Sequence, residues 1–241
     1  MTLLHWHIVL LGWSCSLLIS YSAYYIAPRL FQKAFARGKP TMRLNFAHQS
    51  VSFVHAIVAS LFSLYNMWWT VMPKNLVTGY SATLGAQCAV TVGYFLWDLF
   101  STAANVDYYG PAFMLHAIIG FFPMAIALSP VMLGYVPGFL MFEVSSVFLQ
   151  AHWFIEKLEI GGRWLLLLND ALLLTSFFVC RILFGWILII DVVKATGQNR
   201  EAVGTFFFPI LYFTLAASMT LNHFWFYRLF RATLRAIRGG K

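Results

Sequence analysis

Seven long, mostly apolar stretches recur along the chain, and short polar segments separate them. A run of about 20 such residues is long enough for a helix to cross the hydrocarbon core of a bilayer. The pattern therefore predicts an all-α, polytopic membrane protein with about seven transmembrane helices. The expected spans cover 3–27, 46–69, 81–103, 112–130, 133–154, 164–190 and 205–227.

Prolines interrupt the fourth and fifth expected spans, at Pro123, Pro130 and Pro137. A membrane helix tolerates proline where neighbouring groups satisfy the freed backbone carbonyls. Two full crossings and a re-entrant pair are both compatible with this stretch.

The composition agrees with a membrane protein and excludes other classes. The chain is 61% hydrophobic and only 10% charged, whereas a soluble domain carries about 25% charged residues. So much apolar surface also excludes intrinsic disorder. The three cysteines, Cys15, Cys88 and Cys180, lie in apolar runs without the spacing of a zinc site or a disulfide framework.

The net charge of +8 predicts a membrane topology rather than a nucleic-acid partner. Two basic clusters flank apolar segments and lack the interleaved aromatic residues of a nucleic-acid platform. Such flanks are typical of the cytoplasmic side, and an odd number of spans places both clusters there. We therefore expect a cytoplasmic C-terminus and an N-terminus on the opposite side. The clusters consist of Arg29, Lys33, Arg37, Lys39 and Arg43, and of Arg228, Arg231, Arg235, Arg238 and Lys241.

Polar residues within the expected spans are the candidates for function. A charge near the bilayer centre is costly, so it usually faces a cavity or a partner. Three spans carry polar residues at helical spacing, so that each set lies on one helix face. One polar face on each of several helices predicts a bundle around a polar central chamber. The three sets are His48, Ser52 and His55; Tyr94 and Asp98; and Glu143, Ser146 and Gln150.

Arg181 lies near the middle of the sixth expected span, where the simplest partner is Asp98 or Glu143. A single intramembrane histidine, such as His48 or His223, most often makes a hydrogen bond between helices. The remaining polar positions within the spans are His116, Asp170 and Asn222.

Five segments stand in an order that is informative as a set. They are RLNFAHQSVSFVHAIVAS (43–60), GYFLWDLF (93–100), MLHAIIGF (114–121), FLMFEVSSVFLQAHWFIEKL (139–158) and SFFVCRILFGW (176–186). The set resembles the TLC-domain family, and within it the TLC-domain-containing (TLCD) branch, which is distantly related to ceramide synthases.

The resemblance implies a lipid-handling protein of the endoplasmic reticulum, with helices around a lipid-sized chamber. It also implies the domain organisation. We expect residues 1–42 to form the first transmembrane helix and a basic cytoplasmic loop, 43–230 the TLC-like membrane domain, and 231–241 a basic cytoplasmic tail.

The ceramide-synthase motifs are matched only in part. His116 stands where those enzymes carry the first histidine of a pair, which is implicated in accepting an acyl group, but the second position is Ala117. Their His-Asp-x-x-Asp pattern is represented by Phe142, Glu143 and Ser146. Glu143 matches the TLCD branch instead, as do His55, Asp98 and Arg181.

These comparisons favour a lipid-homeostasis protein that binds a lipid or acyl chain in its bundle, with acyl transfer from acyl-CoA as the associated chemistry. His116 would be the nucleophile or base, and Glu143 or Asp98 would orient it. No cofactor is expected beyond acyl-CoA as a co-substrate, and membrane lipids are the expected partners. The expected substrate-binding residues are His55, Ser52, His48, Arg181, Gln150, Tyr94 and Asn222.

Two alternatives remain open. A non-catalytic lipid regulator, or a cargo- or partner-binding protein of the endoplasmic reticulum, needs no intact catalytic motif. A metal-dependent enzyme would use His48, His55, His116 and Glu143 as ligands, but the chain lacks the HxxxH and HxxHH signatures of such enzymes. We therefore expect no metal site.

Overall fold

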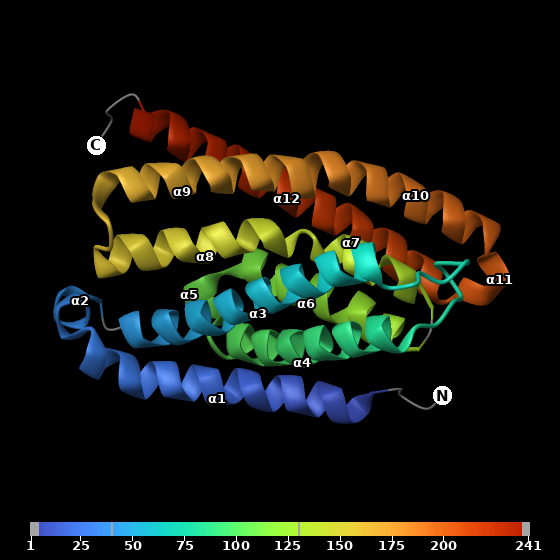
Figure 1. The fold of residues 1–241 in the computed structure, drawn as a ribbon, viewed down its shortest axis with the longest axis horizontal. Coiled ribbons are helices and arrows are strands. Elements are labelled where there is room, and N and C mark those ends of the chain that lie inside the picture. Colours follow the sequence, from blue (N-terminus) through green and yellow to red (C-terminus); the bar gives the residue numbers. More distant parts are fainter. Residues whose placement is uncertain (1–4, 40, 130, 238–241) are drawn as a thin grey trace.

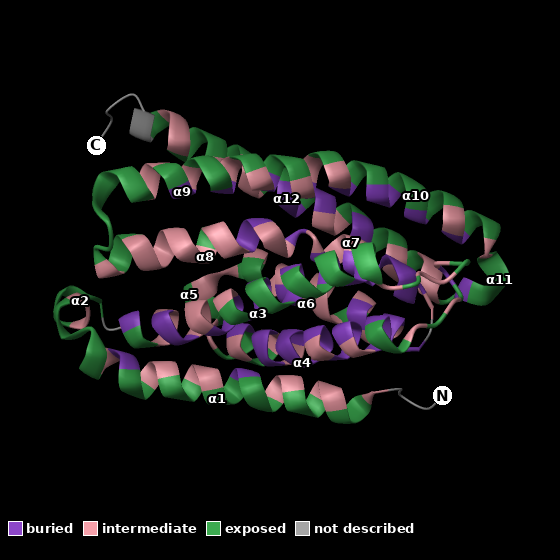
Figure 2. Cartoon of the chain, viewed as in Figure 1, coloured by how far each residue is buried: buried purple, intermediate pink, exposed green. Residues whose placement is uncertain are grey.

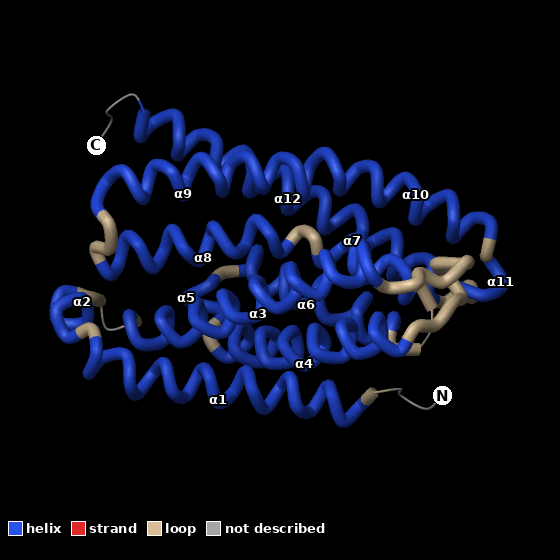
Figure 3. Tube along the Cα trace, in the orientation of Figure 1, coloured by secondary structure: helices blue, strands red, loops and turns tan. Residues whose placement is uncertain are grey.

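The computed structural model describes residues 5–39, 41–129 and 131–237, and Pro130 lies outside that part of the chain. The structure is 86% helical. No strand occurs among the described residues, so the all-α prediction is confirmed (Figure 3).

Each of the seven predicted spans is helical. Successive spans are antiparallel and follow the long axis of the molecule (Figure 1). Short helices α2 (Gln32–Arg37), α5 (Val106–Tyr109) and α11 (Arg200–Val203) lie between them. The long elements are α1 (Trp6–Leu30), α3 (Met42–Trp69), α4 (Ala82–Ala104), α6 (Pro111–Ala127), the series η1 (Leu133–Tyr135), α7 (Val136–Leu140) and α8 (Glu143–Leu158), the series α9 (Gly162–Ser176), η2 (Phe177–Leu183) and α10 (Phe184–Gln198), and α12 (Phe207–Ile237).

Four of these elements are long and apolar enough to cross a membrane. They are Trp6–Leu30, Met42–Trp69, Leu133–Leu158 and Gly162–Gln198, and Pro111–Ala127 is a shorter apolar helix of 17 residues. The chain is therefore a multi-pass membrane protein. The total of seven crossings stays a prediction.

The fifth predicted span is helical in two pieces. Pro137 lies in the first turn of α7, and residues 141–142 form a turn before α8 begins at Glu143. A break of this kind frees backbone carbonyl groups from the helical hydrogen-bond ladder, and in a membrane these groups need other partners. At this junction the carbonyl of Phe142, the N-cap of α8, accepts hydrogen bonds from the Ser145 hydroxyl and from Arg181.

The most buried of the long helices is α4, whereas α1 and α9 present largely exposed faces (Figure 2). Small residues bring α1 and α4 into close contact. A Cβ atom on Gly93 would stand 2.4 Å from the carbonyl oxygen of Val9, and one on Gly12 would stand 2.9 Å from that of Val90. Close helix approach through small residues is a common way to pack membrane helices.

The sixth predicted span is one continuous helix, Gly162–Gln198, with a π-helical segment in its middle. This segment, η2, holds Arg181, which is buried. A π-helical turn carries an extra residue and shifts the directions of the side chains around it, and such turns occur often at functional sites. Sequence periodicity gives no signal for η2.

Candidate functional site

A cavity of about 100 Å³, partly open to the outside, lies between α6, the α7–α8 junction, η2 and α12. Most of the lining is apolar. The polar side chains of the lining are His116, Glu143, Arg181, Thr214, Ser218 and Asn222.

Arg181 is the hub of the polar part of this cavity. Its Nε donates to the Phe142 carbonyl at 3.1 Å and to the Ser145 hydroxyl at 2.7 Å. Its two terminal nitrogens donate to the Asn222 side-chain oxygen at 3.3 Å and to the Ser146 hydroxyl at 2.8 Å. The guanidinium therefore joins η2 to α8 and α12 by hydrogen bonds.

The charge of Arg181 is balanced within the cavity wall. Its Nη2 lies 3.8 Å from Oε1 of Glu143, and its guanidinium carbon lies 5.1 Å from the centre of the Phe177 ring. Arg181 is only 6% exposed. Of the two partners that the sequence suggested, Glu143 is the one in contact with Arg181, and Asp98 is not.

His116 reaches the same cavity from α6. Its ring packs edge-on against Trp225, with centroids 5.4 Å apart, and against Phe95 at 6.1 Å. Among the described residues, His116 has no hydrogen-bond partner, so neither Glu143 nor Asp98 orients the imidazole in this structure. The nitrogen atoms of His116 are thus available to a ligand.

Asp98 belongs to a second polar cluster, between α3 and α4. Its Oδ1 lies 3.4 Å from Nε2 of His48 and accepts a hydrogen bond from Thr102 at 3.5 Å. Nδ1 of His48 lies 3.4 Å from the Ser101 hydroxyl. The imidazole ring of His48 is therefore held between a carboxylate and a hydroxyl group, outside the lining of the cavity.

Tyr109 covers this second cluster from the short helix α5. Its ring centre lies 4.7 Å from that of His48. Burial, together with the nearby Tyr108 and Asp98, raises the pKa of the Tyr109 phenol, which therefore stays protonated.

A third polar cluster, with stacked rings, also lies between α3 and α4. The rings of His55 and Tyr94 are nearly parallel, 7° apart in orientation and 3.7 Å between centres. The Tyr94 hydroxyl donates to Ser52 at 3.2 Å. Phe95, whose ring is 5.9 Å from that of His55, separates this stack from the cavity that it lines.

The structure therefore brings together only part of the set predicted from the sequence. His116, Glu143, Arg181 and Asn222 line one cavity. Gln150 is on α8 with its buried Oε1 atom unpaired among the described residues, and it does not line the cavity. The remaining predicted residues, His48, Ser52, His55, Tyr94 and Asp98, lie on α3 and α4 behind it.

Sequence reasoning missed three residues of the site, namely Ser145, Ser218 and Trp225. Ser145 is adjacent to the polar stripe of α8, but the spacing i, i+3 and i+7 of that stripe does not include it. Ser145 contacts Arg181 because of the turn at residues 141–142 and the π-helical segment, which the sequence does not reveal. Trp225 follows Asn222 by three residues on α12, so the two lie on the same helix face. This spacing is the sequence signal from which Trp225 could have been predicted.

The histidines and the glutamate of the metal hypothesis do not converge. Within the described ranges, no three His, Cys, Asp or Glu side chains form a group that could hold a metal ion. His48, His55 and His116 instead lie in the three separate environments described above.

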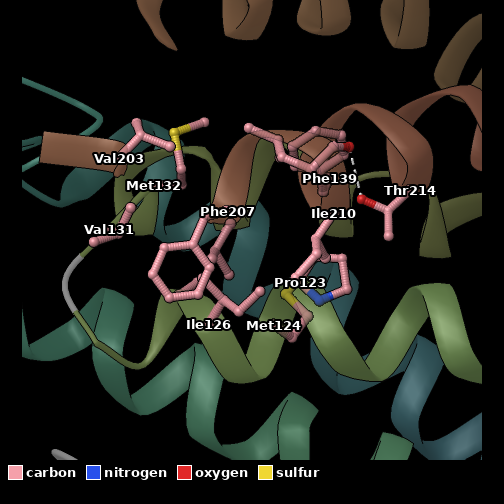
Figure 4. A pocket seen from close by; sticks show the side chains of 13 residues that line it. Pro123, Met124, Ile126, Val131, Met132, Phe139, Val203, Phe207, Ile210 and Thr214 are labelled. Atoms are coloured by element: carbon pink, nitrogen blue, oxygen red, sulfur yellow. Dashed lines mark hydrogen bonds between the residues drawn. The ribbon is translucent and has the colours of Figure 1, made fainter. Parts of the chain in front are cut away.

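A second, almost entirely apolar cavity lies next to the first, between α6 and α12 (Figure 4). It has a volume of about 50 Å³ and shares five lining residues with the first cavity. Its only lining hydroxyl, on Thr214, donates to the backbone carbonyl of Leu211 at 2.8 Å and so presents little polarity to the interior. The shared residues are Pro123, Met124, Phe139, Leu211 and Thr214.

Residues 45–231 match the model of the TLC domain. A TLC domain-containing protein of Schizosaccharomyces pombe is 29% identical over 98% of this chain and 81% of its own length. Topoisomerase I damage affected protein 4 of Saccharomyces cerevisiae is 27% identical over 80% of this chain and 70% of its own. TLC domain-containing protein 4-B of Danio rerio is 24% identical over 87% of this chain and 81% of its own.

The Arg181 cluster predicts a specific stability effect. Arg181→Ala should lower the free energy of unfolding by about 3 kcal/mol, because it removes a buried guanidinium with its hydrogen bonds and leaves the mostly buried Glu143 without its cation. Thermal unfolding of the detergent-purified protein measures the change. Arg231→Ala, at an exposed position on the same side of the fold as other basic residues, is the control and should have little effect. A thermal midpoint of Arg181→Ala equal to that of the wild type would contradict the role of Arg181 as a hub.

Proposed function

The chain belongs to the TLC domain family, and we propose that it holds a lipid or fatty acyl chain in the two adjacent cavities of its bundle. Members of this family are membrane proteins linked to lipid homeostasis. The proposed role of this chain is to bind such a molecule as part of lipid homeostasis in the membrane.

The observation that carries this proposal is the division of the cavity into two chemically different ends. One end, formed by the second cavity, is apolar, as an acyl chain requires. The other end carries the side chains of His116, Glu143, Arg181 and Asn222, which suit a polar headgroup. Binding sites for amphiphilic ligands combine an apolar lining with a few polar groups that fix the orientation.

Blocking the shared part of the cavities tests this binding. Leu211 lines both cavities, so Leu211→Trp should displace a bound lipid while the fold remains intact. Mass spectrometry of lipids extracted from the purified protein should show a defined lipid with the wild type and a loss of most of it with the variant. Leu172→Trp on α9, whose residue is 44% exposed, is the matched control and should retain the lipid. Equal lipid content in the wild type and Leu211→Trp would contradict the proposal.

Acyl transfer at His116 is the second candidate function. The supporting observation is that the imidazole lines the cavity and has no hydrogen-bond partner among the described residues. In this reaction an imidazole nitrogen would form a bond to the carbonyl carbon of an acyl-CoA thioester while the carbon–sulfur bond breaks. The N–H proton of the imidazole would pass to the leaving thiolate. Glu143, which lines the same cavity, would stabilise the positive charge that develops on the ring.

An acylated His116 would be detected directly. Incubation of the purified protein with acyl-CoA should add the mass of one acyl group, which hydroxylamine removes. His116→Ala should abolish the addition, and the equally conservative change His223→Ala, at an exposed position on α12, should not. A protein that stays unmodified but carries a tightly bound lipid would rule out transfer and leave the non-catalytic lipid regulator.

We also propose that the end of the bundle that carries most of the basic residues faces the cytoplasm. We further propose that the protein resides in the endoplasmic reticulum. Arg37 of α2 forms an ion pair with Glu159, directly after α8, at 3.1 Å, which supports a common side for these segments. The last helical turns of α12, with Arg231 and Arg235, lie at the same end of the molecule (Figure 1). Basic flanks favour the cytoplasmic side.

Selective permeabilisation of the plasma membrane tests this topology. An epitope added after residue 241 should be reached by antibody in cells whose internal membranes are intact, and an epitope inserted near Lys74 should not. Both epitopes should coincide with an endoplasmic reticulum marker. Protection of the C-terminal epitope would reverse the proposed orientation.

A further inference from the structure

Building on the proposed lipid-binding function, we propose that the polar end of the cavity recognises an uncharged carbonyl group, of an ester or an amide, through the side-chain amide of Asn222. The ligand class that follows is a neutral acyl lipid rather than a lipid with an anionic headgroup. The inference is based on the orientation of one amide group, its missing partner and the charge balance around it.

The orientation of the Asn222 amide is fixed by its neighbour. Arg181 has only N–H donors, so the atom of Asn222 that faces Nη1 at 3.3 Å must be the oxygen. The amide nitrogen, Nδ2, is therefore the atom that points elsewhere. The donor-only guanidinium thus removes the usual ambiguity between oxygen and nitrogen in this asparagine side chain.

Nδ2 of Asn222 is buried and has no acceptor among the described residues. Asn222 is 2% exposed, and it lines the cavity. An unpaired buried donor is costly, and native proteins leave few of them without a partner. A ligand oxygen in the cavity would satisfy this donor.

The charges around the amide decide what kind of oxygen fits. Arg181 is already paired with Glu143 and with the oxygens of Ser146 and Asn222 itself. An anionic headgroup would add a negative charge beside the Glu143 carboxylate, and like charges brought together out of water are costly. A carbonyl oxygen accepts a hydrogen bond without bringing a charge.

The position of the donor along the cavity agrees with an acyl ligand. Asn222 and Trp225 lie at the His116 end of α12, whereas Leu211 and Thr214, two to three turns earlier, line the apolar part. A carbonyl at Asn222 would therefore leave its hydrocarbon chain free to extend along α12 into the apolar cavity.

Four probes of equal chain length test this inference on the full-length wild-type protein, by native mass spectrometry titration. They are palmitoylglycerol, palmitamide, hexadecane and the permanently charged hexadecanesulfonate. The ester and the amide should bind about threefold to tenfold more tightly than hexadecane, which reflects one buried hydrogen bond. The sulfonate should bind about tenfold more weakly than the ester. Whether the ester or the amide binds more tightly identifies the source of the carbonyl.

Two variants locate the effect. Asn222→Asp keeps an oxygen for Arg181 but removes the donor, so the preference for the ester over hexadecane should disappear. Asn169→Asp is the matched control, because Asn169 is buried on α9 with its amide bonded to the Phe148 carbonyl, and it should keep the preference. Glu143→Gln removes the repelling charge and should raise the affinity for the sulfonate by about tenfold.

The outcomes separate this inference from the proposed function. If no probe binds the wild type, the proposed lipid-binding function fails, and the inference fails with it. If hexadecane binds as tightly as the ester, or the sulfonate binds most tightly, the cavity holds chains but the inference is wrong. If Asn222→Asp does not fold, the affinities of the four probes for the wild-type protein still decide between these outcomes.

Discussion

The need to satisfy one buried guanidinium group within a membrane protein organises the candidate site. Arg181 is always charged, and outside water its N–H groups need acceptors nearby. The structure supplies them from three elements: the turn before α8, the first turns of α8, and α12. These acceptors join the second half of the bundle where the cavity has its polar end.

Two irregularities of the helices follow from this requirement. The turn at residues 141–142 places the Phe142 carbonyl where Arg181 donates to it. The π-helical segment η2 presents the arginine to α8 and α12 together. The arginine also fixes the amide of Asn222, and so it determines which atom of that residue a ligand in the cavity would meet. The structural and the ligand-binding roles of the cluster are thus linked through Arg181.

Much of the architecture could be predicted because hydrophobic length and helical periodicity are local properties of the sequence. The apolar runs became helices, and two residues of the polar stripe of α8, Glu143 and Ser146, do contact Arg181. Gln150, the third, does not line the cavity. The grouping of polar residues between helices could not be predicted, because spacing says which face a residue occupies but not which helix that face meets. Asp98 illustrates the limit: its spacing fits a chamber wall, yet its partner is His48 on α3.

The central claim is that the interior of the bundle holds an acyl chain, and photo-crosslinking in cells tests it most directly. Cells would be supplied with a fatty acid that carries a diazirine in its chain and a tag for purification, and adducts on the protein would be mapped to single residues. We expect adducts on the cavity-lining residues of α6 and α12, such as Met124, Leu211 and Leu215, in addition to the outer surface. Adducts confined to outward-facing residues, such as Leu11 and Leu168, would contradict the claim.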